Sequence, residues 1–122
     1  MRLFLLSLAL GFGISGPAKA GQPYHESLVE CAVLIDLMLG EQSFVPDQNG
    51  MIDLYVAASN AMRAEAERRS SANYVTRTAQ AKRAVWHERW DAQGWDQPEN
   101  RQDLVAWWTY CFKLGRHLNL PL

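Results

Sequence analysis

The sequence predicts an all-α protein: a small four-helix bundle-like domain of three to four helices, stapled by one disulfide between its first and last helices. Apolar residues recur at helical spacing along most of the chain, and no stretch shows the alternation expected of a strand. Glycine, proline and serine breaks divide this pattern into four segments. Cys31 and Cys111 fall near the centres of the apolar faces of the first and last segments, a placement that suits one bridge across a bundle.

The first twenty residues have the pattern of a secretory signal peptide. Arg2 precedes the apolar run LFLLSLALGFGI, and the sequence AKA at residues 18–20 is a small-x-small cleavage site. We expect cleavage after Ala20, which leaves 21–122 as a single helical domain exported to the periplasm or the extracellular space. The apolar run is too short for a membrane anchor, and no later segment approaches the roughly 18 apolar residues that a span needs. Stable membrane insertion is therefore not expected.

The first helix is expected from Tyr24 to Leu39, where Gly40 is a favourable C-terminal residue. One face carries Tyr24, Leu28, Cys31, Ile35 and Met38. A second apolar stripe lies on the opposite side, formed by Val29, Val33 and Leu37. Two explanations fit this stripe. Either the helix is central and packs against neighbours on two sides, or the stripe is exposed and available to a partner.

The second helix is expected from Met51 to Arg68 and the third from Ser71 to Ala92. A single helix over residues 51–92 would be about 63 Å long at 1.5 Å per residue, too long for a domain of this size. The segment RSSAN at residues 69–73 supplies the break, with Ser70 or Ser71 as the candidate N-cap. The third helix carries two stripes, one with Tyr74, Thr78, Ala81 and Val85, the other with Val75, Ala79, Trp86 and Trp90.

The fourth helix has the clearest local start signal in the chain. Asp96 is a natural N-cap, Glu99 follows three residues later, and Pro98 lies in the first turn. The helix is expected from Pro98 to about Arg116, with a clean apolar arc formed by Leu104, Trp107, Trp108, Cys111, Leu114 and Leu118. An even number of cysteines in an exported chain favours a disulfide, here between Cys31 and Cys111.

Charge and motifs exclude several functions. Without residues 1–20, ten basic and thirteen acidic residues remain, so the chain lacks the basic surface that nucleic-acid binding requires. HERW at residues 87–90 begins like a zinc-protease motif but lacks its second histidine, and no metal or other cofactor is expected. No GxSxG elbow is present, and oxidised cysteines offer no thiolate. An enzyme is therefore the less favoured class.

The tryptophans carry the functional hypotheses. Trp86 and Trp90 lie beside Arg83 and Arg89, and tryptophan with arginine is typical of an interface hot spot. The leading interpretation is a non-enzymatic exported protein that binds an unidentified envelope or secreted protein, or a second copy of itself. Its candidate surfaces are Trp86/Trp90/Arg83/Arg89 and the stripe Val29/Val33/Leu37. The alternative is a small-ligand carrier or enzyme with an aromatic pocket between the third and fourth helices, lined by Trp86, Trp90, Trp107 and Trp108. Side-chain burial distinguishes the two.

Overall fold

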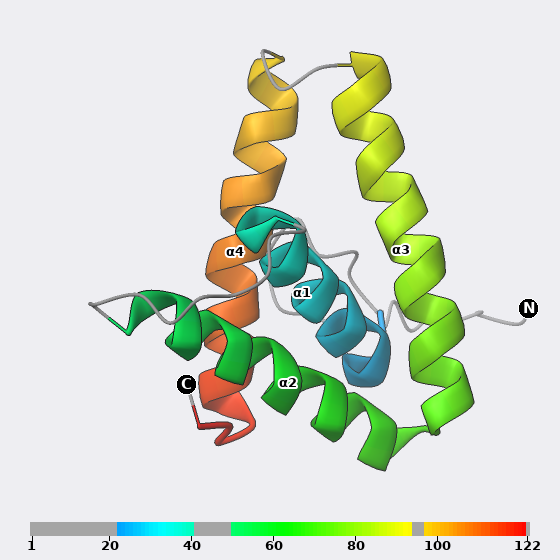
Figure 1. Cartoon of the computed structure of the whole chain (residues 1–122), viewed down its shortest axis with the longest axis vertical. Helices are drawn as coiled ribbons and strands as arrows, with labels where there is room; N and C mark the ends of the chain where they lie inside the picture. Colours follow the sequence, from blue (N-terminus) through cyan, green and yellow to red (C-terminus); the bar gives the residue numbers. More distant parts are fainter. Residues whose placement is uncertain (1–21, 41–49, 94–96, 122) are drawn as a thin grey trace, which may run out of the picture.

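The structure is a computed structural model that describes residues 22–40, 50–93 and 97–121, apart from the side chains of residues 90–93. It contains four helices: α1 (Tyr24–Leu39), α2 (Met51–Arg69), α3 (Ala72–Gln93) and α4 (Pro98–His117) (Figure 1). The described residues contain no strand. The all-α prediction is confirmed, and each helix begins and ends within one residue of its expected position. The predicted signal peptide lies outside the described residues.

Local signals account for the helix boundaries. Gly40 ends α1 with a φ of 78°, a conformation that favours glycine, and its N–H bonds the carbonyl oxygen of Asp36 at 3.1 Å. Ser71 caps α3, since its Oγ accepts the Tyr74 N–H at 3.1 Å. At α4, Pro98 occupies the first turn as expected. The N-cap is Gln97, one residue after the expected Asp96, which lies outside the described residues.

Helix α1 is the centre of the fold. It lies between α3 and α4, is crossed by α2, and packs against all three (Figure 1). As a result, every residue from Ser27 to Ile35 is buried. This burial decides between the two explanations for the second apolar stripe. Val29 and Val33 are fully buried and Leu37 packs against the core, so these side chains form core and do not provide the exposed interaction surface.

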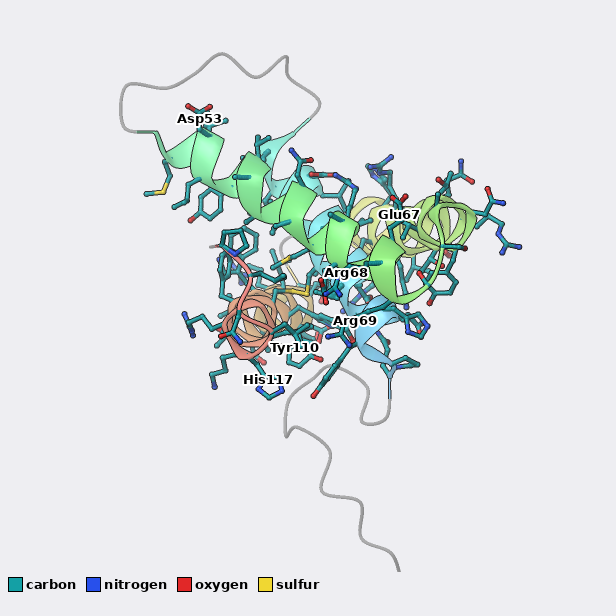
Figure 2. The ribbon with its side chains drawn as sticks, turned by 90° about the horizontal axis from the view of Figure 1, so that it is seen from below. Asp53, Glu67, Arg68, Arg69, Tyr110 and His117 are labelled. Carbon is teal, nitrogen blue, oxygen red and sulfur yellow. A yellow bond between two sulfur atoms is a disulfide. The ribbon has the colours of Figure 1, made fainter. Side chains whose placement is uncertain are left out.

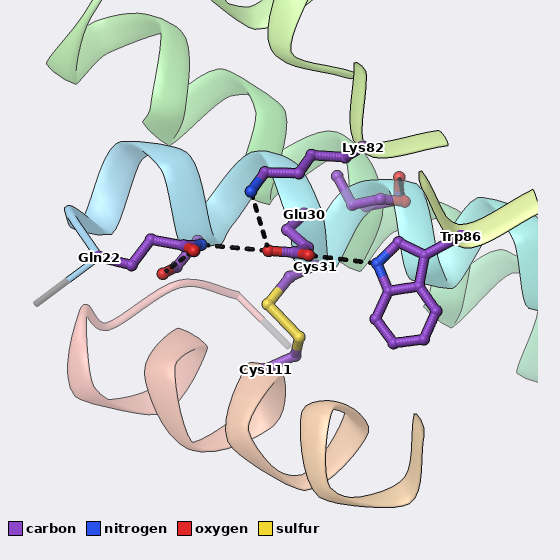
Figure 3. Close-up of a disulfide and its surroundings, with 9 residues drawn as sticks. Gln22, Glu30, Cys31, Lys82, Trp86 and Cys111 are labelled. Carbon is purple, nitrogen blue, oxygen red and sulfur yellow. Dashed lines mark hydrogen bonds and ion pairs between the residues drawn. A yellow bond between two sulfur atoms is a disulfide. The ribbon is translucent and has the colours of Figure 1, made fainter. Parts of the chain in front are cut away.

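A disulfide joins the first and last helices, as predicted. Cys31 on α1 and Cys111 on α4 are bonded, with their Cα atoms 5.5 Å apart and both side chains almost completely buried (Figure 3). On the α2 side of α4, Tyr55 packs edge-on against Trp108 with ring centroids 5.5 Å apart. The apolar arc of α4 therefore serves as the wall that closes the core over α1.

Polar contacts tie α1 to the long helix α2. Near the middle of α2, Ser59 Oγ donates to Asp36 Oδ1 at 2.7 Å, and Arg63 forms an ion pair with the same carboxylate. At the C-terminal end of α2, Glu65 pairs with Arg68 and Arg69, which lie on the last turn (Figure 2). Hydrogen bonds from Arg68 and then Arg69 hold the pKa of Glu65 below its usual value. None of the described helices is long and apolar enough to cross a membrane.

Candidate ligand-binding site

A partly enclosed pocket of about 300 Å³ lies between α3 and α4, with α1 as its floor. Figure 3 shows its α1 side, where Glu30 lies between Lys82 and Trp86 and directly precedes Cys31 in the sequence. The pocket combines two indole rings with two carboxylates and two cationic side chains. Its lining residues are Gln22, Glu30, Lys82, Val85, Trp86, Arg89, Asp103 and Trp107.

Glu30 is the most deeply placed charged group of the pocket, with 7% of its surface exposed. Its two oxygens accept from different sides. Trp86 Nε1 donates to Oε1 at 3.2 Å, while Gln22 Nε2 donates to Oε2 at 3.1 Å (Figure 3). Lys82 Nζ lies 3.4 Å from Oε2. A buried carboxylate is costly without such partners, and these three donors hold the Glu30 side chain in place.

Lys82 projects from α3 and joins two carboxylates of α1. Its Nζ lies 2.9 Å from Glu26 Oε1, closer than to Glu30. Burial by itself lowers the pKa of Lys82, but the hydrogen bond to Glu26 and the charges of Glu30 and Glu26 outweigh it, so the pKa is raised above its ordinary value. Lys82 therefore remains a cation near neutral pH.

A second ion pair closes the pocket on the α4 side. Arg89 of α3 and Asp103 of α4 approach to 2.6 Å, and both side chains are about one quarter exposed. The guanidinium carbon of Arg89 also lies 4.4 Å from the centroid of a Trp86 ring, a cation–π contact. Asn100 of α4 adds a 3.4 Å hydrogen bond from its amide to the Arg89 carbonyl oxygen. These contacts connect α3 to α4 beside the pocket.

The structure separates the sequence-predicted tryptophan and arginine residues. Trp86 is 1% exposed and lines the pocket together with Arg89, so it is not a surface hot spot. The Trp90 side chain lies outside the described residues. Arg83 is exposed and does not line the pocket; after burial, its positive charge is the second cause of the lowered pKa of Arg63 on α2.

The expected aromatic pocket between the third and fourth helices has a different lining. Trp86 and Trp107 do meet there, but Trp108 packs on the other side of α4 against Tyr55 and Phe112. The charged groups Lys82 and Asp103 were not singled out from the sequence, and Glu30, which could pair with Glu26, was expected to be a surface acid. Glu30 gave one usable signal, because it is a lone charge within the apolar run LVECAVLI. Such a residue must find partners on another helix once it is buried.

An open groove of about 500 Å³ continues from the pocket along α3. It shares Lys82 and Val85 with the pocket and is otherwise lined by Glu26, Tyr74, Arg77, Thr78 and Ala81. Four of its members are the first stripe of the third helix noted in the sequence. That stripe therefore lines a solvent-facing groove, whereas Val75 and Trp86 of the second stripe enter the core.

Neither metal chemistry nor a known relative explains the site. Across residues 22–40, 50–93 and 97–121, no group of three or more His, Cys, Asp and Glu side chains could hold a metal ion. No protein-family model, curated protein or solved structure matches the chain significantly. The pocket is therefore the feature of the molecule from which a function can be inferred.

Proposed function

We propose that the chain is an exported, disulfide-bonded binding protein that holds a small ligand in the pocket between α3 and α4. The observation that carries this proposal is the pocket itself, a hollow of about 300 Å³ lined by indole rings and paired charges. Small-molecule sites of proteins begin at about this volume and combine apolar walls with a few polar groups that orient the ligand. This choice corresponds to the ligand-carrier alternative, because Val29, Val33 and Trp86, three of the side chains expected to form a protein interface, are buried.

The chemistry of the lining favours recognition over catalysis. A general base must be able to accept a proton near neutral pH. Lys82 is a poor candidate, because its raised pKa keeps it protonated. The Glu30 oxygens already accept from Gln22 and Trp86, and Asp103 is paired with Arg89. Groups held in this way are positioned to orient a charged ligand.

Export is supported by two features. The pattern of residues 1–20 is that of a signal peptide, and the Cys31–Cys111 disulfide fits an oxidising compartment. In the processed chain Gln22 would be the second residue, and its amide already bonds Glu30.

The test is ligand screening on the processed, oxidised chain of residues 21–122. Thermal unfolding is followed against a library of small metabolites, and we expect at least one compound to raise the midpoint, since binding to the folded state stabilises it. Val85→Trp fills the pocket edge and should abolish this shift. Val105→Trp is the matched control, because Val105 is also exposed but does not line the pocket. A library without any stabilising compound, or equal shifts in both variants, would overturn the proposal.

One observation favours a second candidate function, binding of another protein or a second copy. Met38 at the end of α1 and Met51 and Leu54 at the start of α2 are large apolar side chains about half exposed. Met51 and Leu54 are three residues apart and therefore neighbours on the surface of α2, and exposed apolar side chains that adjoin one another are typical of interaction sites. Sedimentation of the processed chain tests self-association. A dimer that Leu54→Ser dissociates would support this candidate, and a strictly monomeric protein would remove the homodimer.

A further inference from the structure

The two cationic side chains of the pocket lie on one wall. Lys82 and Arg89 are seven residues apart on α3, so they lie almost in line along the helix, about 10 Å apart in rise. Trp86 lies between them, with its Nε1 donating to Glu30 and its ring beneath Arg89. Lys82 and Arg89 therefore form a basic wall on helix α3, and the Trp86 indole lies between these two cationic side chains.

The two carboxylates of the pocket belong to the facing helices. Glu30 comes from α1 and lies 3.4 Å from Lys82, and Asp103 comes from α4 and lies 2.6 Å from Arg89. These two residues form an acidic wall opposite the basic one. The lining as a whole is electrically balanced, because its two acids match its two bases.

This arrangement selects among ligands by charge. A ligand with only a negative charge at the Lys82–Glu30 contact would put a second carboxylate beside Glu30, which would keep only the neutral donors Gln22 and Trp86. A ligand with only a positive charge would put a second cation beside Lys82, which would keep Glu26 as its partner. Like charges brought together in a partly buried site are costly. A zwitterion avoids both costs, because its carboxylate lies against Lys82 and its ammonium lies against Glu30.

The contact between Lys82 and Glu30 is the place where a ligand can enter. It is the longest ion pair of the pocket at 3.4 Å, whereas charge-assisted hydrogen bonds usually measure about 2.7–2.9 Å. Both residues also keep other partners if the contact opens. Lys82 retains Glu26 at 2.9 Å, and Glu30 retains Gln22 and Trp86. Val85, which is half exposed, borders this point and offers an apolar contact.

We infer that the pocket binds a small zwitterion, a molecule with one ammonium and one carboxylate group, between Lys82 and Glu30. This inference rests on the proposed binding function and names its ligand class. The ligand carboxylate accepts hydrogen bonds from Lys82, and its ammonium donates to Glu30. Recognition thus depends on both charges of one molecule.

The experiment is calorimetric titration of the processed, oxidised chain with a series of amino acids of increasing length. Glycine, β-alanine, 4-aminobutanoate and 6-aminohexanoate carry both charges at growing separation, while acetate and ethylammonium carry one charge each. We expect at least one zwitterion to bind and both single ions to bind about tenfold more weakly or not at all. Intrinsic fluorescence gives a second readout, because the indoles of Trp86 and Trp107 line the pocket.

Variants locate the site. Lys82→Gln and Glu30→Gln each remove one charge, and we expect each to weaken binding by about tenfold or more. Lys82→Arg keeps the charge and should retain binding. Asp36→Asn is the control, because Asp36 belongs to the ion pair between α1 and α2 and does not line the pocket. If Lys82→Gln does not fold, the ligand series on the unaltered protein decides alone.

The outcomes separate this inference from the proposed function. If acetate or ethylammonium binds as tightly as the best zwitterion, the inference of a zwitterionic ligand is wrong, while the proposed binding function stands. The inference is also wrong if only neutral or singly charged metabolites stabilise the protein in the library screen and Val85→Trp abolishes their effect. If no compound of any charge binds, both fail. A zwitterion that binds equally well to Lys82→Gln and Glu30→Gln also overturns the inference.

Discussion

Two neighbouring residues of α1 belong to two regions with different chemistry. Cys31 faces α4 within the apolar core and is covalently bonded to it, whereas Glu30 faces the charged pocket between α3 and α4 (Figure 3). The first region is stabilised by burial and a covalent bond, which hardly depend on salt. The second is stabilised by ion pairs and a cation–π contact, which are directional and exchangeable. The covalent and apolar region therefore fixes the fold, whereas the contacts of the charged pocket are the ones that the proposed ligand would replace.

The largest expected effect is loss of the disulfide. The bond links residues 80 positions apart, and the chain-entropy model gives a contribution of about 4.5 kcal/mol for such a loop. The double variant Cys31→Ala/Cys111→Ala should lose about this much free energy of unfolding, measured by urea denaturation. A loss below about 1 kcal/mol would contradict the role of the covalent bond in this region.

A core substitution should come next. Leu34 is fully buried on α1, so Leu34→Ala leaves a cavity and should cost about 2–5 kcal/mol in the same measurement. Val105→Ala is the control, because Val105 is 65% exposed on α4 and its substitution should change stability by less than about 0.5 kcal/mol. Equal effects at the two positions would show that α1 is less enclosed than its burial indicates.

A smaller effect concerns the pH dependence of the pocket. The pKa of Lys82 is raised in the folded state. Its contribution to the free energy of unfolding is therefore complete at pH values below its ordinary pKa of 10.5, and it is lost as the pH rises through the folded-state pKa. Lys82→Met should cost about 1–2 kcal/mol at neutral pH. We expect this difference to shrink above pH 10.5, measured by thermal unfolding of both proteins. A difference that grows with alkaline pH would contradict this sign.

The smallest expected effect is the coupling between α3 and α4. A double-mutant cycle with Arg89→Ala and Asp103→Ala should give an interaction energy of about 0.5–1 kcal/mol, because both side chains are partly exposed. This coupling should decrease when the salt concentration is raised, since exposed charges are screened. If the coupling persists at high salt, the Arg89–Asp103 pair resembles the apolar region, whose stability hardly depends on salt.

The sequence predicted the helices well because their ends depend on local signals. Gly40 and the serine at position 71 act on residues within one turn, so their effects can be derived without the fold. The disulfide was also predictable, since both cysteines lie at the centres of apolar faces. A pocket between the third and fourth helices with Trp86 and Trp107 was one of the two alternatives, but its charged lining was not predicted, because it depends on which stripe of α3 turns inward. The stripe with Trp86 does so, and this brings Lys82 and Arg89 opposite carboxylates from two other helices.

The second apolar stripe of α1 is another feature whose placement could not be derived from the sequence alone. Val29 and Val33 are compatible with either a buried or an exposed face, and only the arrangement of α2, α3 and α4 decides between them. Glu30 was likewise visible as an isolated charge, but its partners Trp86 and Lys82 are more than fifty positions away in the chain. Long-range contacts of this kind cannot be derived from the spacing within one segment.

The all-round burial of α1 has a consequence for folding during synthesis. Among the described helices α1 is synthesised first, but the partner of Cys31 is in α4, the last of them. Its contacts with α2 are local in sequence and can form early, whereas the face that α4 covers remains open until the chain is nearly complete. Native disulfide pairing is therefore a late event, and any chain truncated before Cys111 leaves both an unpaired thiol and an uncovered apolar face on α1.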